Sequence, residues 1–201
     1  MPPDMKTRAP AATRQRLLVA GERLFRTQGY AATGLKELSH TAQAPWGSMY
    51  HFFPGGKEAL GVETLAYAGE LYRAGLQAIF ERAPSPAAAI DWIFEGEALL
   101  LEKSDYRDGC PIASVTLDIA STSEALRAAC ADAFASWLGA IETAMLAAGA
   151  APADAAALAG FILSSLEGAI VLSRAAKDPA PLRQSGRFVR QAVEGVLLAG
   201  G

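Results

Sequence analysis

The side chains best suited to bind a polyanion are concentrated near the start of the sequence. Residues 1–64 contain eight basic and five acidic groups, a formal charge of +3, whereas the remainder contains ten basic and sixteen acidic groups, a formal charge of −6. The whole chain has a net charge of −3 and a pI near 5.5, so it is not uniformly basic. A basic segment on an acidic body indicates that the first part of the chain meets a polyanion. Its basic residues are Lys6, Arg8, Arg14, Arg16, Arg23, Arg26, Lys36 and Lys57.

Several residues between positions 33 and 57 suit contacts with a nucleic-acid duplex. Tyr50 offers a hydroxyl on a rigid ring to a phosphate oxygen, and Lys57 places an ammonium at the predicted start of a long helix, near its free N–H groups. Gly47 allows close approach of the backbone to a groove, and Ser48 can donate to or accept from a base edge. The candidate DNA-binding residues are Thr33, Pro45, Trp46, Gly47, Ser48, Tyr50, His51, Lys57, Arg8 and Arg14.

The stretch between Glu37 and Lys57 carries no Asp, Glu, Lys or Arg. A charged bidentate contact with guanine is therefore not available from it. We expect readout by Ser48, by Trp46 against thymine methyl groups, and by His51. Two alternatives stay open: Trp46 folds down onto the first helix, and His51 caps a helix or faces solvent.

Groups for catalysis or metal binding are sparse. The two cysteines, Cys110 and Cys130, and the two histidines, His40 and His51, lack the close spacing of a metal site or a nucleophile–base pair. No Gly-rich phosphate loop is present. We therefore expect no enzyme activity, no metal and no cofactor. Buried packing is the expected role of both cysteines, with redox sensing as the alternative.

The first predicted helix follows a flexible basic arm over residues 1–12. From Thr13 onward, apolar residues recur with a helical period that includes Leu17 and Phe25. Gly29 then predicts a left-handed stop.

Two further short helices complete the motif. Thr33 is a good N-cap for a helix that continues to about Ala42. Pro45 closes a turn and opens a third helix over residues 46–53, which ends before Pro54. Two short helices joined by a tight turn are the helix-turn-helix plan, here spanning residues 13–56.

Longer helices follow over residues 57–201, the predicted ligand-binding and dimerisation domain. No segment alternates with period two, so the fold class is all-α: a three-helix helix-turn-helix domain followed by a helical bundle. The predicted longer helices cover residues 57–82, 87–103, 111–120, 123–148, 153–176 and 180–199.

Apolar side chains that recur at helical spacing in this domain pack a core or line a ligand pocket between the helices. Glu167 lies in an apolar stretch, where an unpaired carboxylate is costly. We expect it to pair with Arg174 or with a second chain, or to meet the polar end of a ligand. The candidate ligand-binding residues are Trp92, Leu99, Cys110, Phe134, Trp137, Phe161 and Glu167.

The last two predicted helices are rich in Ala and Leu and weak in charge. Helices too apolar to face water usually pack against a copy of themselves, so we expect a homodimer through this pair. The start of the sequence lacks the apolar stretch of a signal peptide, and residues 38–56 are too polar for a membrane span. The expectation is a cytoplasmic protein with no membrane contact.

The ordered motifs of residues 13–62 resemble the DNA-binding domain of TetR/AcrR regulators. They are LFxxxGY at 24–30, Thr33, Leu38 with Ala42, GSxYHxF at 47–53 and KEAL at 57–60. Two later segments, GCPIASVTLDIAS at 109–121 and LEGAIVLSRA at 166–175, resemble the LmrA-like branch, as does the double glycine before Lys57. The resemblance implies an all-helical homodimer that reads the major groove of double-stranded operator DNA. It also implies a small hydrophobic or aromatic effector that controls operator affinity.

The sequence departs from the family in its turn, where the usual Gly-Val-Ser is Gln43-Ala44-Pro45. We expect Gln43 to occupy the helix end without a positive φ. Many relatives carry Lys or Arg where this chain has Trp46.

The functional hypothesis is a ligand-responsive repressor that binds a pseudo-palindromic operator as a homodimer and leaves it when the effector binds. The uncharged reading helix supports the alternative, a dimeric small-molecule-binding module with little or no DNA affinity.

Overall fold

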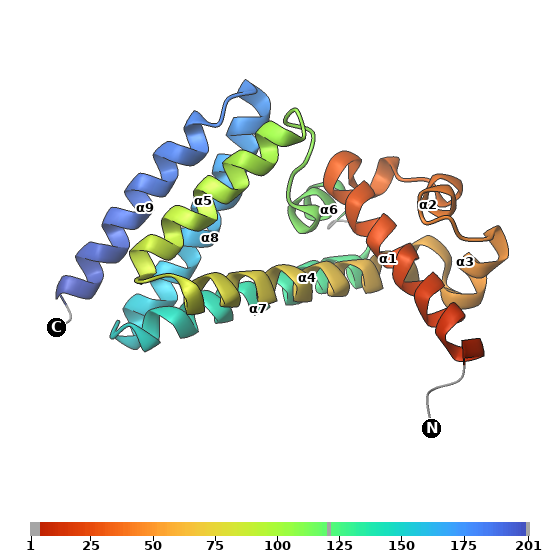
Figure 1. The fold of residues 1–201 in the computed structure, drawn as a ribbon, viewed down its shortest axis with the longest axis horizontal. Coiled ribbons are helices and arrows are strands. Elements are labelled where there is room, and N and C mark those ends of the chain that lie inside the picture. The colour runs from red at the N-terminus through yellow and green to blue at the C-terminus, as the bar shows by residue number, and fades with distance from the viewer. Residues whose placement is uncertain (1–4, 120–121, 200–201) are drawn as a thin grey trace. The chain divides into compact units, whose positions relative to one another are not determined.

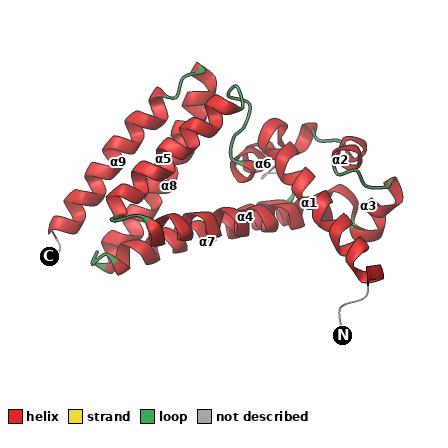
Figure 2. Ribbon diagram, viewed as in Figure 1, coloured by secondary structure: helices red, strands yellow, loops and turns green. Residues whose placement is uncertain are grey.

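The computed structural model describes residues 5–119 and 122–199. Its ordered elements in this part of the chain are helices joined by short loops (Figures 1 and 2), which confirms the all-α class. They are α1 (Met5–Ala32), α2 (Leu35–Thr41), α3 (Trp46–Phe52), α4 (Gly56–Arg82), α5 (Pro86–Lys103), α6 (Pro111–Ile119), α7 (Glu124–Ala147), α8 (Pro152–Ala176) and α9 (Ala180–Ala199). The longer helices begin and end within one residue of their predicted bounds.

The first helix begins earlier than the sequence predicted, at Met5 rather than Thr13. The flexible arm is therefore wrong from Met5 onward, and residues 1–4 lie outside the described part. Ala, Lys, Arg and Met all favour helix, so the composition that suggested an arm also permits a helical extension.

Two compact units divide the chain. The first contains the described residues up to Ala68 together with Pro111–Ala133, and the second contains Gly69–Cys110 and the described residues from Phe134 onward. The division falls inside α4 and α7, whereas the domain boundary predicted from the sequence lies at the start of α4. That boundary stays a prediction.

The first unit is built around α1, which packs against α2, α3 and α6 (Figure 1). Apolar side chains from α1, α2 and α3 and from the residue after α3 are completely buried in its core, among them Phe25, Leu38, Met49 and Phe53. The stripe expected on the first helix therefore faces the interior, with Leu17 also fully buried.

Gly29 interrupts α1 with φ 80° and ψ 174°, a conformation that is essentially restricted to glycine. Its position also leaves no room for a side chain, because a Cβ there would lie 2.4 Å from Oδ2 of Asp118 on α6. Asp118 in turn accepts a hydrogen bond from the Ala31 N–H at 3.2 Å. The stop predicted at Gly29 is thus also the place where α6 approaches the end of α1.

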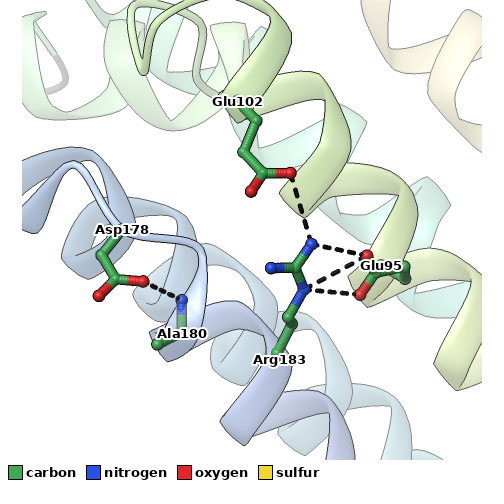
Figure 3. Close-up of polar contacts among 5 residues, drawn as sticks. All are labelled: Glu95, Glu102, Asp178, Ala180 and Arg183. Carbon is green, nitrogen blue, oxygen red and sulfur yellow. Dashed lines mark hydrogen bonds and ion pairs between the residues drawn. The ribbon is translucent and has the colours of Figure 1, made fainter.

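In the second unit, α9 packs against both α5 and α8. Arg183 on α9 donates to Glu95 on α5 at 2.8 Å. Its guanidinium also lies 3.4 Å from the carboxylate of Glu102, further along α5 (Figure 3). Arg190 extends this set of exposed ion pairs to Asp91. Exposed pairs contribute little individually, so the burial of Val189 and Val193 accounts for more of the α5–α9 attachment.

Replacing Gly29 by Ala should lower the free energy of unfolding by about 2–4 kcal/mol, because the backbone conformation and the Asp118 contact both exclude a Cβ. Urea denaturation measures the change. Gly75→Ala is the matched control, since a Cβ at this position in α4 has open space and Ala is the better helix former. Equal effects of the two substitutions would contradict this account.

Candidate functional site

The exposed surface of α3 is aromatic and uncharged. Trp46 and Tyr50, one helical turn apart, are 45% and 51% exposed, and their rings pack edge-on with centroids 5.8 Å apart. His51 is also exposed, whereas Met49 is buried on the opposite side. The exposure of Trp46 agrees with a position at the helix surface and not with burial against the first helix.

The beginning of α3 leaves its backbone open. Pro45 is the N-cap residue and its carbonyl accepts from the Ser48 N–H at 2.9 Å. A Cβ at Gly47 would meet nothing within 4 Å, so this glycine provides open space beside the helix backbone. Six candidate DNA-binding residues therefore lie on α3 or at its N-terminal end. They are Pro45, Trp46, Gly47, Ser48, Tyr50 and His51, of which Ser48 is half-buried and the others are exposed.

The turn before α3 is a complete Schellman motif, in which the Ala44 N–H donates to the Ser39 carbonyl and the Gln43 N–H donates to the His40 carbonyl, each at 3.0 Å. Gln43 has φ 49°, so the expectation that it would avoid a positive φ was wrong. The motif requires a left-handed residue after the C-cap whatever its side chain, and Gln43 adopts that conformation without the freedom of glycine.

Thr33 does not have its predicted role. The N-cap of α2 is Gly34, and the Thr33 hydroxyl donates to the Gly29 carbonyl at 2.7 Å. Its side chain is fully buried, so its hydroxyl is not available to a phosphate. The N-cap prediction was wrong because the Thr33 hydroxyl bonds to the Gly29 carbonyl in the preceding bend, and sequence spacing does not reveal that bond.

Lys57 and Arg14, both predicted to contact DNA, have partners inside the first unit. The Lys57 ammonium donates to the Ala31 carbonyl at 3.3 Å and lies 4.3 Å from the centroid of the Tyr30 ring. Burial lowers the pKa of Lys57, and the nearby Asp118 carboxylate opposes that shift. Arg14 pairs with Glu63 and lies over the Phe53 ring. The Arg8 side chain lies outside the described residues.

In the second unit, Phe134 and Trp137 form an aromatic group with Tyr72. The rings of Phe134 and Trp137 meet edge-on at 5.5 Å, and Tyr72 lies 5.6 Å from Trp137. The Trp137 indole N–H donates to the Gly69 carbonyl at 2.8 Å and the residue is buried. The other aromatic and aliphatic candidates for ligand binding, Trp92, Leu99 and Phe161, are exposed. Among these five candidates, a ring contact joins Phe134 and Trp137.

Glu167 does not pair with Arg174, as the sequence had suggested. The Arg174 guanidinium donates to the Arg107 carbonyl at 3.1 Å, and it occupies the space beside Gly109. The Glu167 carboxyl instead shares a hydrogen bond with the Cys110 thiol. Its Oε2 is buried and has no hydrogen-bond partner among the described residues. Two predicted ligand residues, Cys110 and Glu167, are therefore in contact.

The Glu167 carboxyl has an unusual protonation equilibrium. Burial raises its pKa to about 7, the Cys110 hydrogen bond opposes the rise, and the negative charge of Glu97 adds to it. Both cysteines are buried, and burial also raises the pKa of the Cys130 thiol. No group of three or more His, Cys, Asp and Glu side chains is placed to hold a metal ion in the part of the chain that the structure describes.

Sequence reasoning missed two side chains that bond to the backbone of the helix-turn-helix, the acceptor Asp118 and the donor Arg16. Asp118 and Arg16 bond to backbone groups that are 87 and 26 residues away in the chain, respectively. No local spacing connects such residues, and only the resemblance of the α6 segment to a known family singled out the neighbourhood of Asp118.

Comparison with known proteins places this arrangement in a family. Residues 17–64 match the model of bacterial regulatory proteins of the tetR family, and residues 86–188 match the C-terminal domain of LmrA/YxaF-like transcriptional regulators. The HTH-type transcriptional regulator YxaF of Bacillus subtilis is 35% identical over 170 residues, 85% of this chain and 89% of that protein. The chain belongs to the TetR family of transcriptional regulators. It is thus a DNA-binding regulator with an LmrA/YxaF-like C-terminal domain, and its family members are not enzymes.

Two further similarities agree with the TetR assignment. The regulator LmrA of Bacillus subtilis is 31% identical over 85% of this chain and 90% of its own length. A TetR regulatory protein from Rhodobacter sphaeroides has the same fold, with a TM-score of 0.79 over 89% of this chain and 97% of the other at 23% identity.

The stability of this TetR-family protein should fall as pH rises from about 4.5 to about 7. The unfolded chain ionises Glu167 first, while the folded chain retains the proton, so the folded state loses up to about 3 kcal/mol relative to the unfolded state. Glu167→Gln should remove this loss and exceed the wild type in stability at pH 8 but not at pH 4.

Urea denaturation at the two pH values measures the difference. Asp132→Asn, which changes an exposed carboxylate on α7, is the control and should follow the wild type at both. If the free energy of unfolding of Glu167→Gln also equals that of the wild type at both pH values, folded Glu167 does not retain its proton and this account is wrong.

Proposed function

We propose that this TetR-family regulator is a cytoplasmic, homodimeric repressor that binds a pseudo-palindromic operator and is released by a small hydrophobic or aromatic effector. The observation that carries the proposal is the exposed surface of α3. Its aromatic side chains Trp46 and Tyr50 and the open space at Gly47 are accessible, while the buried Met49 holds the helix against the core. The two α3 helices of such a dimer must lie about 34–36 Å apart to enter successive turns of the major groove.

The α3 surface supports readout by shape and apolar contact. Trp46 and Tyr50 present an aromatic edge and a hydroxyl, while His51 and Ser48 supply polar groups on the same short helix. Lys57 and Arg14 each have an internal partner, and phosphate contact by either uses the N–H donors that remain or replaces that partner. Arg8 and the α3 hydroxyls are the proposed additional contacts.

Two exposed helix faces support the homodimer. On α8 one set of exposed residues repeats at intervals of three and four, and one set on α9 does the same, the spacing with which helices pack together. The residues are Phe161, Ser164, Gly168, Val171 and Ala175 on α8, and Gln184, Phe188, Gln191, Gly195 and Leu198 on α9. None carries a charge, and Leu172 beside the α8 set is 61% exposed.

The same face explains why α8 is the one described helix long and apolar enough to cross a membrane by length and composition. An apolar helix with one side against α9 and the other against a second protein chain needs no bilayer. The longest stretch without Asp, Glu, Lys or Arg lies at residues 38–56, outside α8, so the search for an uncharged stretch does not reveal this property.

The effector contact is proposed for the second unit. The aromatic group around Trp137 offers apolar surface, and the Glu167 carboxyl offers an oxygen with no hydrogen-bond partner in the part of the chain that the structure describes. An effector that prefers a conformation unsuited to the operator weakens DNA binding by the same factor by which DNA weakens effector binding. Helix α4 contributes residues to both units and is the proposed covalent path between them.

Fluorescence anisotropy with the DNA upstream of its own gene, a scrambled duplex and a salt series tests the repressor. We expect at least about 10³-fold preference for the operator and a steep fall of affinity with salt. Equal, weak binding to both duplexes, repeated after selection from random DNA, would instead support the module that binds a small molecule and has little DNA affinity.

Trp46→Ala tests how the operator is read. Selectivity should fall about ten-fold, the scale of one base contact, while affinity for the scrambled duplex stays unchanged. Trp92→Ala, which removes another exposed tryptophan from the second unit, is the control. A uniform loss of affinity on all duplexes would exclude base reading by Trp46.

Phe188→Glu tests the dimer face, since the wild type should have twice the 21.0 kDa mass of one chain. A carboxylate buried in an apolar interface is costly, so dimer affinity should weaken at least about 100-fold. Light scattering across a dilution series measures it, with Leu146→Glu on α7 as the exposed control. A Phe188→Glu protein that remains dimeric at the same concentrations would place the interface elsewhere.

A further inference from the structure

The guanidinium of Arg16 holds the turn of the helix-turn-helix. Its Nε donates to the Ala42 carbonyl at 3.0 Å, and one terminal nitrogen lies within hydrogen-bond distance of both the Gln43 carbonyl, at 3.4 Å, and the Thr13 hydroxyl, at 3.2 Å. We propose that Arg16 is a positioning residue that directs the reading helix α3 by fixing the end of α2, a role that rests on the proposed operator binding.

The two carbonyls that Arg16 binds have no partners within α2. The last carbonyls of a helix point away from it and carry its partial negative charge, so a cation with several N–H donors satisfies both needs. Ala42 is the C-cap and Gln43 is the left-handed residue that follows it. Arg16 therefore bonds to the backbone at the point where the chain reverses.

The position of α3 depends directly on this reversal. Only Ala44 and Pro45 separate Gln43 from the first residue of α3, and Pro45 is itself the N-cap. A non-glycine residue in the left-handed region is strained, and Gln43 relieves that strain by a change of φ unless its neighbours prevent the change. The Schellman hydrogen bonds, the Ser39 hydroxyl that donates to the Ala44 carbonyl at 3.3 Å, and Arg16 oppose such a change, and Arg16 is the contact from another helix.

The same guanidinium was a candidate phosphate contact from charge alone, because Arg16 belongs to the basic segment of the sequence. The two roles differ in geometry. A phosphate contact needs only a positive charge, whereas two carbonyls on successive residues need the planar fork of Arg, which Lys does not provide. Arg16→Lys and Arg16→Met therefore separate the roles.

Amide hydrogen exchange of the free protein tests the turn without DNA. In Arg16→Met and in Arg16→Lys, exchange at the Gln43 and Ala44 N–H groups should be at least about ten-fold faster, since the turn opens more often. Arg23→Met, which changes another exposed arginine of α1, is the control and should leave both groups unchanged. Unchanged exchange in both Arg16 variants would overturn the proposal.

Operator binding tests the consequence. Both Arg16 variants should lose about ten-fold in preference for the operator over a scrambled duplex, while the salt dependence stays that of the wild type. Adding Gln43→Gly should restore the preference of Arg16→Met, because glycine keeps the left-handed turn without the clamp. Arg23→Met serves again as the control.

The contrary result is equally specific. If Arg16→Lys binds like the wild type, while Arg16→Met weakens binding to both duplexes, lowers the salt slope by about 0.9 and is not rescued by glycine, Arg16 is a phosphate contact and the proposal is wrong. A wild-type protein that shows no preference for any duplex contradicts the proposed function instead, and the exchange experiment still decides whether Arg16 holds the turn.

Discussion

The bend at residues 29–33 is the constraint on which the first unit depends. Gly29 turns the chain with a backbone conformation that other residues avoid, and its missing side chain lets Asp118 approach. Hydrogen bonds from α1, α4 and α6 converge there: Thr33 reaches back to the Gly29 carbonyl, Lys57 reaches the Ala31 carbonyl, and Asp118 accepts from the Ala31 N–H. The end of α1, the start of α4 and α6 are thereby fixed to one short segment, beside which α2 begins.

Three basic side chains of the first unit form contacts within the unit itself. Arg14, Arg16 and Lys57 belong to the basic segment that indicated a polyanion, yet each has a partner within the unit. Net charge counts ionisable groups without their partners, so it predicts the class of ligand better than it predicts the contacting residues. The aromatic, uncharged face of α3 is the surface proposed to read bases.

The second unit combines a covered core with two exceptional features. Its buried residues follow the helical period, whereas α8 and α9 each expose an uncharged set of residues and Glu167 places a carboxyl oxygen in the interior without a hydrogen-bond partner among the described residues. A carboxyl raised to a pKa of about 7 is a cost that the protein carries in its folded state. The same buried oxygen is an acceptor that a bound molecule can use, which gives the effector proposal its polar end.

The sequence by itself determined the longer helices from α4 onward to within one residue, the stop at Gly29, the turn before Pro45 and the family, because these depend on local propensity and on motifs along the chain. It placed the start of α1 at Thr13 rather than at Met5. It could not determine that Thr33 is buried, that Gln43 is left-handed, that Arg16 bonds to the Ala42 carbonyl, or that Glu167 bonds to Cys110 rather than to Arg174. In each case the deciding partner lies on another element or across a turn, and a side chain takes the partner that packing brings within about 3 Å, whatever its own type suggests. Only the tertiary structure fixes which atoms those are.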